Sequence, residues 1–249
     1  MFKREQEQYG ELGADYWWLG GKYDIVADLM RRHCAPVRGK REILDVGCGP
    51  GNLIGHLSAF GVVTGSDFSD DAVRLAHGKE YREVVHSKAE ELPFENACFD
   101  TVVALDIIEH TPDDVATIKE IARVLKPGGE IVFSLPAYMC LWGPHDEIYG
   151  HYRRYTRGEI VRKLEAGGFE IAQATYIEPA FLPLLFIIRR LKRLSTRPQD
   201  DFVALPRWLN TVLRHVIAAE RHVTRIGDIP FGVSILGVAR KHDSRDSRD

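Results

Sequence analysis

The residues best placed to do chemistry form a glycine-rich turn with an acid downstream. In residues 43–53, Gly47, Gly49 and Gly51 follow an apolar run and precede a helical pattern. Glycine lets the backbone approach a ligand closely, and the first turn of a helix offers free N–H groups. Asp67 ends the next apolar run, twenty residues after Gly47, which suits hydrogen bonds to the hydroxyls of a ribose. The segment therefore predicts a site for a ligand that contains a nucleoside.

The spacing of the glycines separates two kinds of cofactor. Dinucleotide dehydrogenases carry the pattern GxGxxG, which cradles a pyrophosphate. Positions 47, 49 and 51 give GxGxG instead, with Asp45 just before them. This loop suits a nucleoside that carries an amino-acid tail, so a nicotinamide dehydrogenase is disfavoured. A strand-to-helix turn that binds nothing is the structural alternative.

Five short segments follow one another in an order typical of one enzyme family. They are DVGCG (45–49), GSDFS (65–69), AEELPF (89–94), FDTVVALD (99–106) and LKPGG (125–129). The chain resembles the class I S-adenosylmethionine-dependent methyltransferases of the type 11 group over about residues 41–177 and the last strand. The resemblance implies methyl transfer as the reaction and S-adenosyl-L-methionine as the cofactor.

The resemblance also implies which residues meet the cofactor. Asp67 is expected on the ribose, Phe68 beside the adenine, and the end of the fourth strand beside the methionine part. Family members often cover the cofactor with an N-terminal helix, so an aromatic residue and a lysine from that helix join the set. The full set of expected cofactor residues is Asp45, Gly47, Cys48, Gly49, Asp67, Phe68, Ala89, Glu90, Leu105, Asp106, Trp17 and Lys22.

The acceptor side needs a base. Methyl transfer from a sulfonium is an in-line displacement, and an oxygen or acidic carbon acceptor must also lose a proton. A base should lie near the carboxyl ends of the strands, where open parallel sheets bind ligands. The expected catalytic residues are His145, His151, His110 and Tyr155, with His145 beside Asp146 as the first choice. The structural alternatives are that His110 braces its loop and that His151 and Tyr155 belong to a hydrogen-bonded corner before a capping box at residues 156–159.

A metal site is not expected. Residues 145–147 read His-Asp-Glu, and some catechol-directed methyltransferases hold two hydroxyls with a divalent cation. Adjacent residues point in different directions, so three consecutive ligands are geometrically awkward. The prediction is therefore no metal.

Residues 178–228 interrupt the alternation of strands and helices before the final strand. This segment carries nine Lys and Arg against five Asp and Glu, and its residues 180–188 are apolar. Basic residues from Arg189 to Arg197 follow, which suits a helix at a lipid interface. A second stripe of apolar residues from Trp208 to Ile226 is expected to cover the first helix. Alternatively the two helices roof a pocket; both versions favour a hydrophobic or aromatic small-molecule acceptor.

Other functions receive less support. An Asn-Pro-Pro-Tyr signature after the fourth strand is absent, because Asp106-Ile107-Ile108-Glu109 stands there, which argues against a base nitrogen as acceptor. A protein acceptor and a non-catalytic adaptor that binds S-adenosylmethionine both stay open. The formal net charge of −3 disfavours a globally basic binder of nucleic acid.

Length and composition predict a globular protein. The chain has 249 residues, 45% of them hydrophobic, and four cysteines without a CxxC pair, which indicates reduced thiols. We see no secretory signal after Met1 and no apolar run of about 18 residues, so a cytoplasmic protein is expected, with peripheral membrane contact as an option.

Alternating apolar runs and helical stretches predict an α/β fold: a Rossmann-like, mostly parallel sheet of seven strands with helices on both faces. The helical stretches 70–77 and 113–125 both open with Asp, a preferred N-cap. We expect a helical cap at 1–40, a cofactor-binding core at 41–177 and 229–241, and a helical insertion at 178–228.

Overall fold

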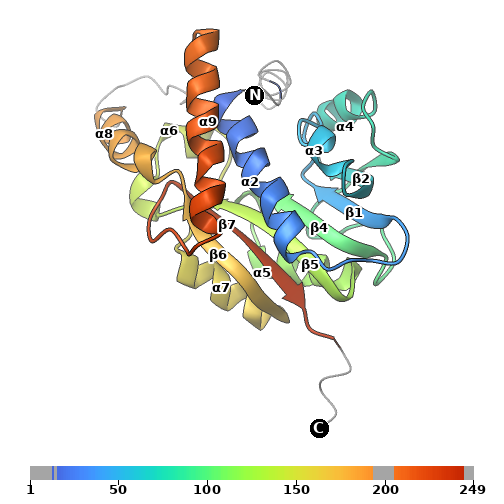
Figure 1. The fold of residues 1–249 in the computed structure, drawn as a ribbon. Helices are drawn as coiled ribbons and strands as arrows, with labels where there is room; N and C mark the ends of the chain where they lie inside the picture. The colour runs from blue at the N-terminus through green and yellow to red at the C-terminus, as the bar shows by residue number, and fades with distance from the viewer. Residues whose placement is uncertain (1–12, 14–15, 193–204, 244–249) are drawn as a thin grey trace.

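A seven-stranded sheet forms the centre of the molecule (Figure 1). The computed structural model describes residue 13 and residues 16–192 and 205–243. The strand order is β3-β2-β1-β4-β5-β7-β6, and only β7 is antiparallel to its neighbours. The strands are β1 (Arg41–Val46), β2 (Gly61–Asp67), β3 (Glu83–His86), β4 (Phe99–Leu105), β5 (Leu125–Pro136), β6 (Phe169–Ile177) and β7 (Ser234–Lys241). The predicted fold is confirmed.

Helices cover both faces of this sheet (Figure 1). The α-helices are α2 (Trp17–His33), α3 (Ile54–Leu57), α4 (Asp70–Ala76), α5 (Asp114–Val124), α6 (Pro144–Ile148), α7 (Arg157–Ala166), α8 (Leu182–Lys192) and α9 (Arg207–Thr224), and the 3-10 helices are η1 (Ile108–His110), η2 (Met139–Leu141) and η3 (Pro179–Phe181). Successive side chains of a strand point to opposite faces. Val102 of β4 accordingly joins the core under α5 and α7, and Val103 joins the core under α2 and α9.

Side-chain caps explain where several helices begin. Asp113 Oδ1 accepts a hydrogen bond from the Ala116 amide at 2.9 Å, so the cap predicted for α5 is confirmed. At α4 the cap is Ser69, which accepts from the Ala72 amide, and the prediction of Asp70 was wrong by one residue. The capping box expected at residues 156–159 forms at the start of α7.

The segment between β6 and β7 leaves the sheet and forms η3, α8 and α9. Helix α9 lies along α2, and the two approach so closely that a Cβ on Gly21 would lie 2.6 Å from the Cβ of Ile217. The predicted apolar stripe is therefore divided: Ile217 is buried against α2, whereas Trp208 and Val212 are exposed. Among the described residues, no helix combines the length and apolar character needed to cross a bilayer.

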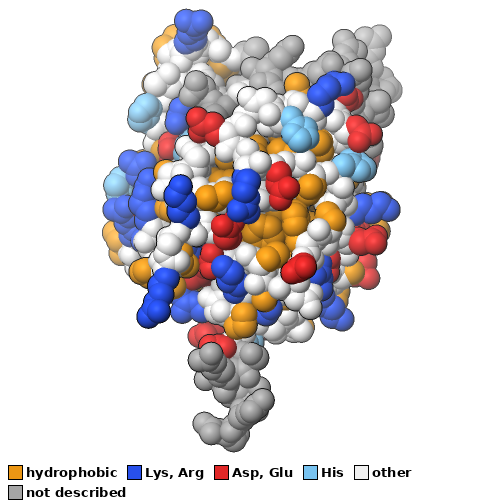
Figure 2. All heavy atoms as spheres, turned by 90° about the vertical axis from the view of Figure 1, so that its right-hand side faces the viewer, with side chains coloured by type: hydrophobic (Ala, Val, Ile, Leu, Met, Phe, Trp, Pro, Cys, Tyr) orange, Lys and Arg blue, Asp and Glu red, His pale blue; other side chains and the backbone are white. Residues whose placement is uncertain are grey.

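Charges of both signs mix on one broad face of the molecule. Figure 2 shows basic and acidic side chains interspersed around a group of hydrophobic side chains near its centre. Lys and Arg side chains are most frequent along the left edge of this view, and acidic side chains lie mainly toward its centre and right.

Candidate active site

One cavity of about 490 Å³ runs from the carboxyl ends of the first strands to the insertion helices. Its first part is lined by the glycine turn after β1, by Asp67 and Phe68 after β2, and by the end of β4. Its second part is lined by the loop after β5, by η3 and α8, and by the start of α2. Open parallel sheets bind ligands at this edge. We call the two parts the cofactor half and the acceptor half.

The glycine turn needs glycine for its backbone conformation. Gly47, Gly49 and Gly51 have φ angles of +70°, +53° and +76°, a region that L side chains rarely adopt. A Cβ on Gly47 would also lie 2.7 Å from Cδ1 of Ile107. The turn therefore presents bare backbone to the cavity.

Asp67 fixes this turn through both carboxylate oxygens. Oδ2 accepts a hydrogen bond from the Gly49 amide and Oδ1 accepts one from the Ser69 amide, each at 2.9 Å. Burial raises the pKa of Asp67, although these two amides favour its charged form. The Phe68 amide bonds to the same carboxylate, which offers about four acceptor sites, so Asp67 can still accept from a ribose hydroxyl at the cavity wall.

Asp45 lies deeper beside the turn. Its Oδ2 accepts a hydrogen bond from the Tyr81 hydroxyl at 2.6 Å. Burial, opposed by this hydrogen bond and assisted by the charge of Asp67, raises the pKa of Asp45 to about 7. Asp45 thus supports the turn and lines the cavity at its base.

An ion pair between the buried Lys22 and the partly exposed Asp106 lies where the two halves meet. Lys22 Nζ of α2 lies 2.6 Å from Asp106 Oδ2, and the Ser134 hydroxyl donates to Asp106 Oδ1 at 2.5 Å. Burial alone lowers the pKa of Lys22, but the charges of Asp106 and Glu178 raise it overall. Lys22 itself does not line the cavity, so the structure places it behind Asp106, and its assignment as a cofactor contact is corrected.

Aromatic side chains at the start of α2 line the cavity. Trp17 lines the cavity, and its ring centroid lies 5.1 Å from that of Phe181 in η3. The indole N–H of Trp18 donates to Glu178 Oε1 at 2.5 Å. Helix α2 is therefore connected to the insertion by ring contact and by a hydrogen bond.

Three histidines meet in the acceptor half. His110, His145 and His151 all line the cavity. The ring centroids of His110 and His151 are 4.5 Å apart, and those of His145 and His151 are 5.9 Å apart. Burial and the neighbouring His151 lower the pKa of His110 to about 3, so it is neutral at neutral pH. The structure thus brings together the three histidines that the sequence analysis named separately.

Asp146 pairs with His151 and not with its sequence neighbour His145. Its Oδ1 lies 2.9 Å from His151 Nδ1 and 2.7 Å from Arg154 Nε, and its Oδ2 lies 3.1 Å from Arg189 Nη1. Burial raises the pKa of Asp146, but these partners together hold it well below the ordinary value. Asp146, named in the sequence analysis only as the neighbour of His145, therefore points to the chain that follows α6.

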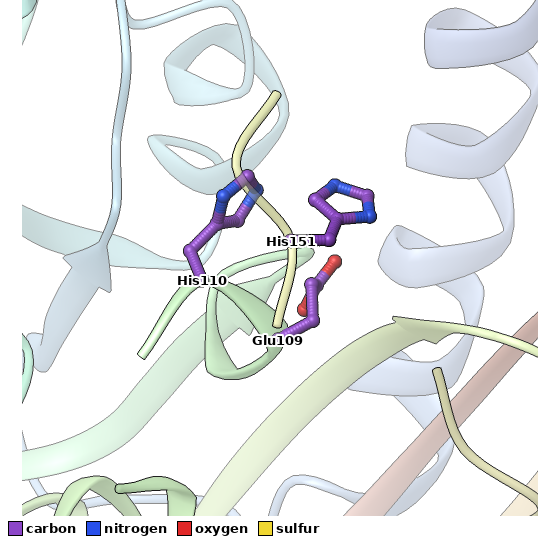
Figure 3. A group of neighbouring side chains, drawn as sticks. All are labelled: Glu109, His110 and His151. Carbon is purple, nitrogen blue, oxygen red and sulfur yellow. The ribbon is translucent and has the colours of Figure 1, made fainter. Parts of the chain in front are cut away.

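Glu109 is a site residue that the sequence analysis quoted without giving it a role. It is completely buried, it lines the cavity, and its oxygens have no hydrogen-bond partner in any other described residue. Burial and the negative charge of Asp106 raise its pKa well above the ordinary value. Figure 3 shows its carboxylate turned toward His151. A Glu-His pair after the fourth strand was the available signal.

Besides Lys22, three expected site residues lie outside this cavity. The Tyr155 hydroxyl donates to Asp114 Oδ2 at 2.8 Å, and the residue is buried in the hydrophobic core under α5 and α7. Ala89 and Glu90 are also absent from the cavity wall. Tyr155 therefore belongs to the structural corner that the sequence analysis kept as an alternative, and its assignment as catalytic is corrected.

Comparison with known proteins gives the same family. A family model described as "Methyltransferase domain" matches residues 44–133. A ubiquinone biosynthesis O-methyltransferase of Paracidovorax citrulli is 41% identical over 147 residues, which cover 52% of this chain and 60% of that protein. In four further curated relatives, the matched region covers 57–61% of the relative's length. The chain thus spans about 60% of the length of these relatives.

Two further matches extend over most of the chain. A putative methyltransferase of Bacillus halodurans shares the fold with a TM-score of 0.56 at 22% identity, covering 87% of this chain and 98% of that one. A ubiquinone biosynthesis O-methyltransferase of Ralstonia nicotianae is 30% identical over 240 residues, which cover 87% of this chain and 94% of that protein. The cavity at the strand ends, the glycine turn and this long match agree, and the chain belongs to the class I S-adenosylmethionine-dependent methyltransferases.

Proposed function

We propose that the protein transfers the methyl group of S-adenosylmethionine to a hydroxyl of an aromatic acceptor that carries an apolar substituent. The observation that carries this proposal is the single cavity that joins the glycine turn to the apolar wall of η3 and α8. A cofactor at the first part and an acceptor at the second would share one enclosed space. Methyl transfer needs such a space because donor and acceptor must meet in line and water must be excluded.

The cofactor half supports S-adenosylmethionine. Backbone amides of the turn, the Asp67 carboxylate and the half-exposed Phe68 ring surround one end of the cavity. A carboxylate suits ribose hydroxyls, and an aromatic ring offers a face to a purine. Toward the second half, the charged Asp106 lies at the wall, where the cationic part of the cofactor would find a counter-charge.

The acceptor half supports an apolar partner. Its outer wall is formed by Phe181, Leu184, Leu185 and Ile188, with Leu205 and Leu213 completing it. Burying apolar surface contributes roughly 25 cal/mol per Å². The two relatives described above are named ubiquinone biosynthesis O-methyltransferases, which favours oxygen over nitrogen or carbon as the methyl acceptor in this chain.

Side chains that line the cavity can accept the proton that the acceptor loses in this reaction. The acceptor hydroxyl gives its proton to one of the histidines at positions 110, 145 and 151, and its oxygen forms a bond to the methyl carbon. The carbon–sulfur bond breaks, its electron pair stays on sulfur, and S-adenosylhomocysteine leaves as a neutral thioether. General-base catalysis typically contributes about 10²–10⁴-fold.

The test uses S-adenosylmethionine with a methyl label and two catechols, one bare and one with an alkyl or prenyl chain. We expect calorimetric binding of the cofactor, labelled methyl ether as product, and kcat/KM at least about 10-fold higher for the tailed catechol. His145→Ala and His151→Ala should lower kcat with cofactor affinity nearly unchanged. Cofactor binding without turnover on these catechols or on a cell extract would favour the adaptor, and a labelled protein would favour a protein acceptor.

We also propose that the insertion touches membranes from the cytoplasmic side to collect such an acceptor. Leu184 and Ile187 of α8, and Trp208 of α9, are more than half exposed. The basic cluster expected beside them is only partly available: Arg189 is buried against Asp146, Arg190 is exposed, and residues 193–197 lie outside the described residues.

Flotation with anionic vesicles tests the membrane contact. Full-length protein should float, and Trp208→Ser should reduce the floated fraction several-fold because an interfacial indole is lost. Trp142→Ser is the control, because it removes a half-buried indole in the loop after β5. Equal flotation of Trp208→Ser and wild type, or no flotation at all, would contradict the contact while leaving the methyl transfer untouched.

A further inference from the structure

We propose that Glu109, His110 and His151 bind a divalent first-row transition-metal cation that holds the acceptor hydroxyl. The role of the metal in catalysis rests on the proposed function. The metal site itself is argued from the positions of the three side chains. One ligand atom of each residue lies within 4.8 Å of the other two (Figure 3). Two of the residues come from η1 and the third from the loop after α6, so the chain brings the set together by folding.

Glu109 supplies the strongest argument. A fully buried carboxylate without a partner is costly, and native structures pair such groups with donors, charges or metals. Lys22 and Arg154, the two cations whose charges act on Glu109, are paired with Asp106 and Asp146. A cation between Glu109 and the two histidines would satisfy the carboxylate directly.

The two histidines are oriented as metal ligands are. Metal-binding histidines almost always donate the second ring N–H to a carboxylate or a backbone carbonyl. His151 Nδ1 lies 2.9 Å from Asp146 Oδ1, and the His110 ring hydrogen-bonds the backbone of Tyr149. Each ring therefore has one nitrogen fixed from outside the cluster and the other available to an ion.

The ligand types indicate which ion fits. Two imidazoles and one carboxylate suit Zn²⁺, Co²⁺, Mn²⁺ or Fe²⁺, whereas Mg²⁺ prefers oxygen ligands. Zn–N and Zn–O bonds of about 2.0–2.1 Å place tetrahedral ligand atoms about 3.4 Å apart, so ligand atoms within 4.8 Å of one another must close in by up to about 1.4 Å. Rotation of the side chains accomplishes this, because all three residues line open cavity space.

The ion would act on the acceptor. With three protein ligands, a fourth position faces the cavity and can take an acceptor hydroxyl, or two adjacent hydroxyls. Coordination lowers the pKa of the hydroxyl, so the oxygen becomes a nucleophile at neutral pH. The proton then passes to His145, which lines the same wall and is not part of the cluster. The charge of the ion does not change in this step.

The test is titration of the metal-free full-length protein with Co²⁺, without cofactor or acceptor. We expect visible ligand-field absorption that saturates at one ion per chain, and a melting temperature that rises with Co²⁺. Glu109→Gln keeps the size of the side chain, and His151→Gln removes one imidazole. Each single variant should weaken Co²⁺ binding at least about 100-fold. His86→Ala is the control, because its exposed ring lies on the edge strand β3.

Outcomes separate this inference from the proposed function. Binding of S-adenosylmethionine is measured by calorimetry on the same samples, and a normal value in Glu109→Gln shows that the variant is folded. Absence of Co²⁺ binding in wild type, or equal binding in wild type, Glu109→Gln and His151→Gln, would overturn the metal site. Loss of cofactor binding in wild type would overturn the proposed function and leave the metal result standing.

Discussion

The two halves of the cavity are built in different ways. The cofactor half is made largely from residues 45–69, where two consecutive strands end and backbone amides line the turn. The acceptor half is made from side chains that arrive from η1, α6, α8 and α9. In the cofactor half, the site residues lie close together because they follow two neighbouring parallel strands. In the acceptor half, the site residues come together only when segments distant in sequence pack against one another.

Asp146 illustrates the second kind of construction. Its partners are His151 and Arg154 of its own loop and Arg189 of α8, 43 residues away in sequence. The insertion is thus held to the acceptor loop by a buried charge network. Substitutions in the cofactor half should therefore mainly weaken cofactor binding. Substitutions in the acceptor half should mainly lower the free energy of unfolding and the turnover rate.

The largest effect is expected at the glycine turn. Gly47→Ala places a Cβ against Ile107 and strains a φ of +70°, so the turn must move and cofactor affinity should fall at least about 100-fold. Gly128→Ala is the matched control, since its φ of +73° is equally strained but nothing lies within 4 Å. Calorimetry with S-adenosylmethionine compares the two, and equal affinities would break the assignment of the cofactor half.

A smaller loss is expected at the ribose position. Asp67→Ala removes a charged acceptor and also releases the amides of Gly49 and Ser69, which should weaken cofactor binding by about 1–3 kcal/mol. Asp70→Ala, a nearby exposed acid of α4, should leave the affinity within about 2-fold. A normal dissociation constant for Asp67→Ala would move the ribose elsewhere.

The contrast between the halves also explains what the sequence could predict. The apolar runs before Asp45, Asp67 and Asp106 are local signals, and the sheet order follows from their alternation with helices. The partners of Asp146 could not be predicted in this way, because two of them follow the short helix α6 and the third, Arg189, lies in α8. The Glu-His pair after the fourth strand pointed to the position of Glu109 but not to its role, since its burial depends on the packing of η1 under the loop that carries Arg154.

The connection between insertion and acceptor loop should be measurable in stability. Arg189→Met keeps the length of the side chain but removes one buried partner of Asp146, and we expect a loss of about 2 kcal/mol in the free energy of unfolding. Arg190→Met alters an exposed guanidinium over Phe186 and should change stability by less than about 0.5 kcal/mol. Denaturant unfolding compares them, and similar values would mean that Arg189 does not hold α8 in place.

The smallest effect concerns pH and the contact of α9 with the end of β6. Burial, opposed by the Glu178 amide that donates to it at 2.7 Å and assisted by the charge of Glu178, raises the pKa of Glu220 to about 7. The protonated form is favoured in the folded state, so its stabilisation is complete below about pH 4.5 and is lost as pH rises through 7. Buried histidines with lowered pKa values, such as His110, act in the opposite direction over part of this range.

The difference between Glu220→Gln and wild type therefore isolates the carboxyl group. The substituted side chain cannot ionise, but its oxygen can still accept from the Glu178 amide. The variant should therefore gain stability relative to wild type as pH rises from about 4.5 to about 7, on the order of 1 kcal/mol. Glu165→Gln, an exposed position on α7, should show no such trend. A constant difference across this pH range would show that folding does not raise the pKa of Glu220, and the close contact between α9 and Glu178 would need another explanation.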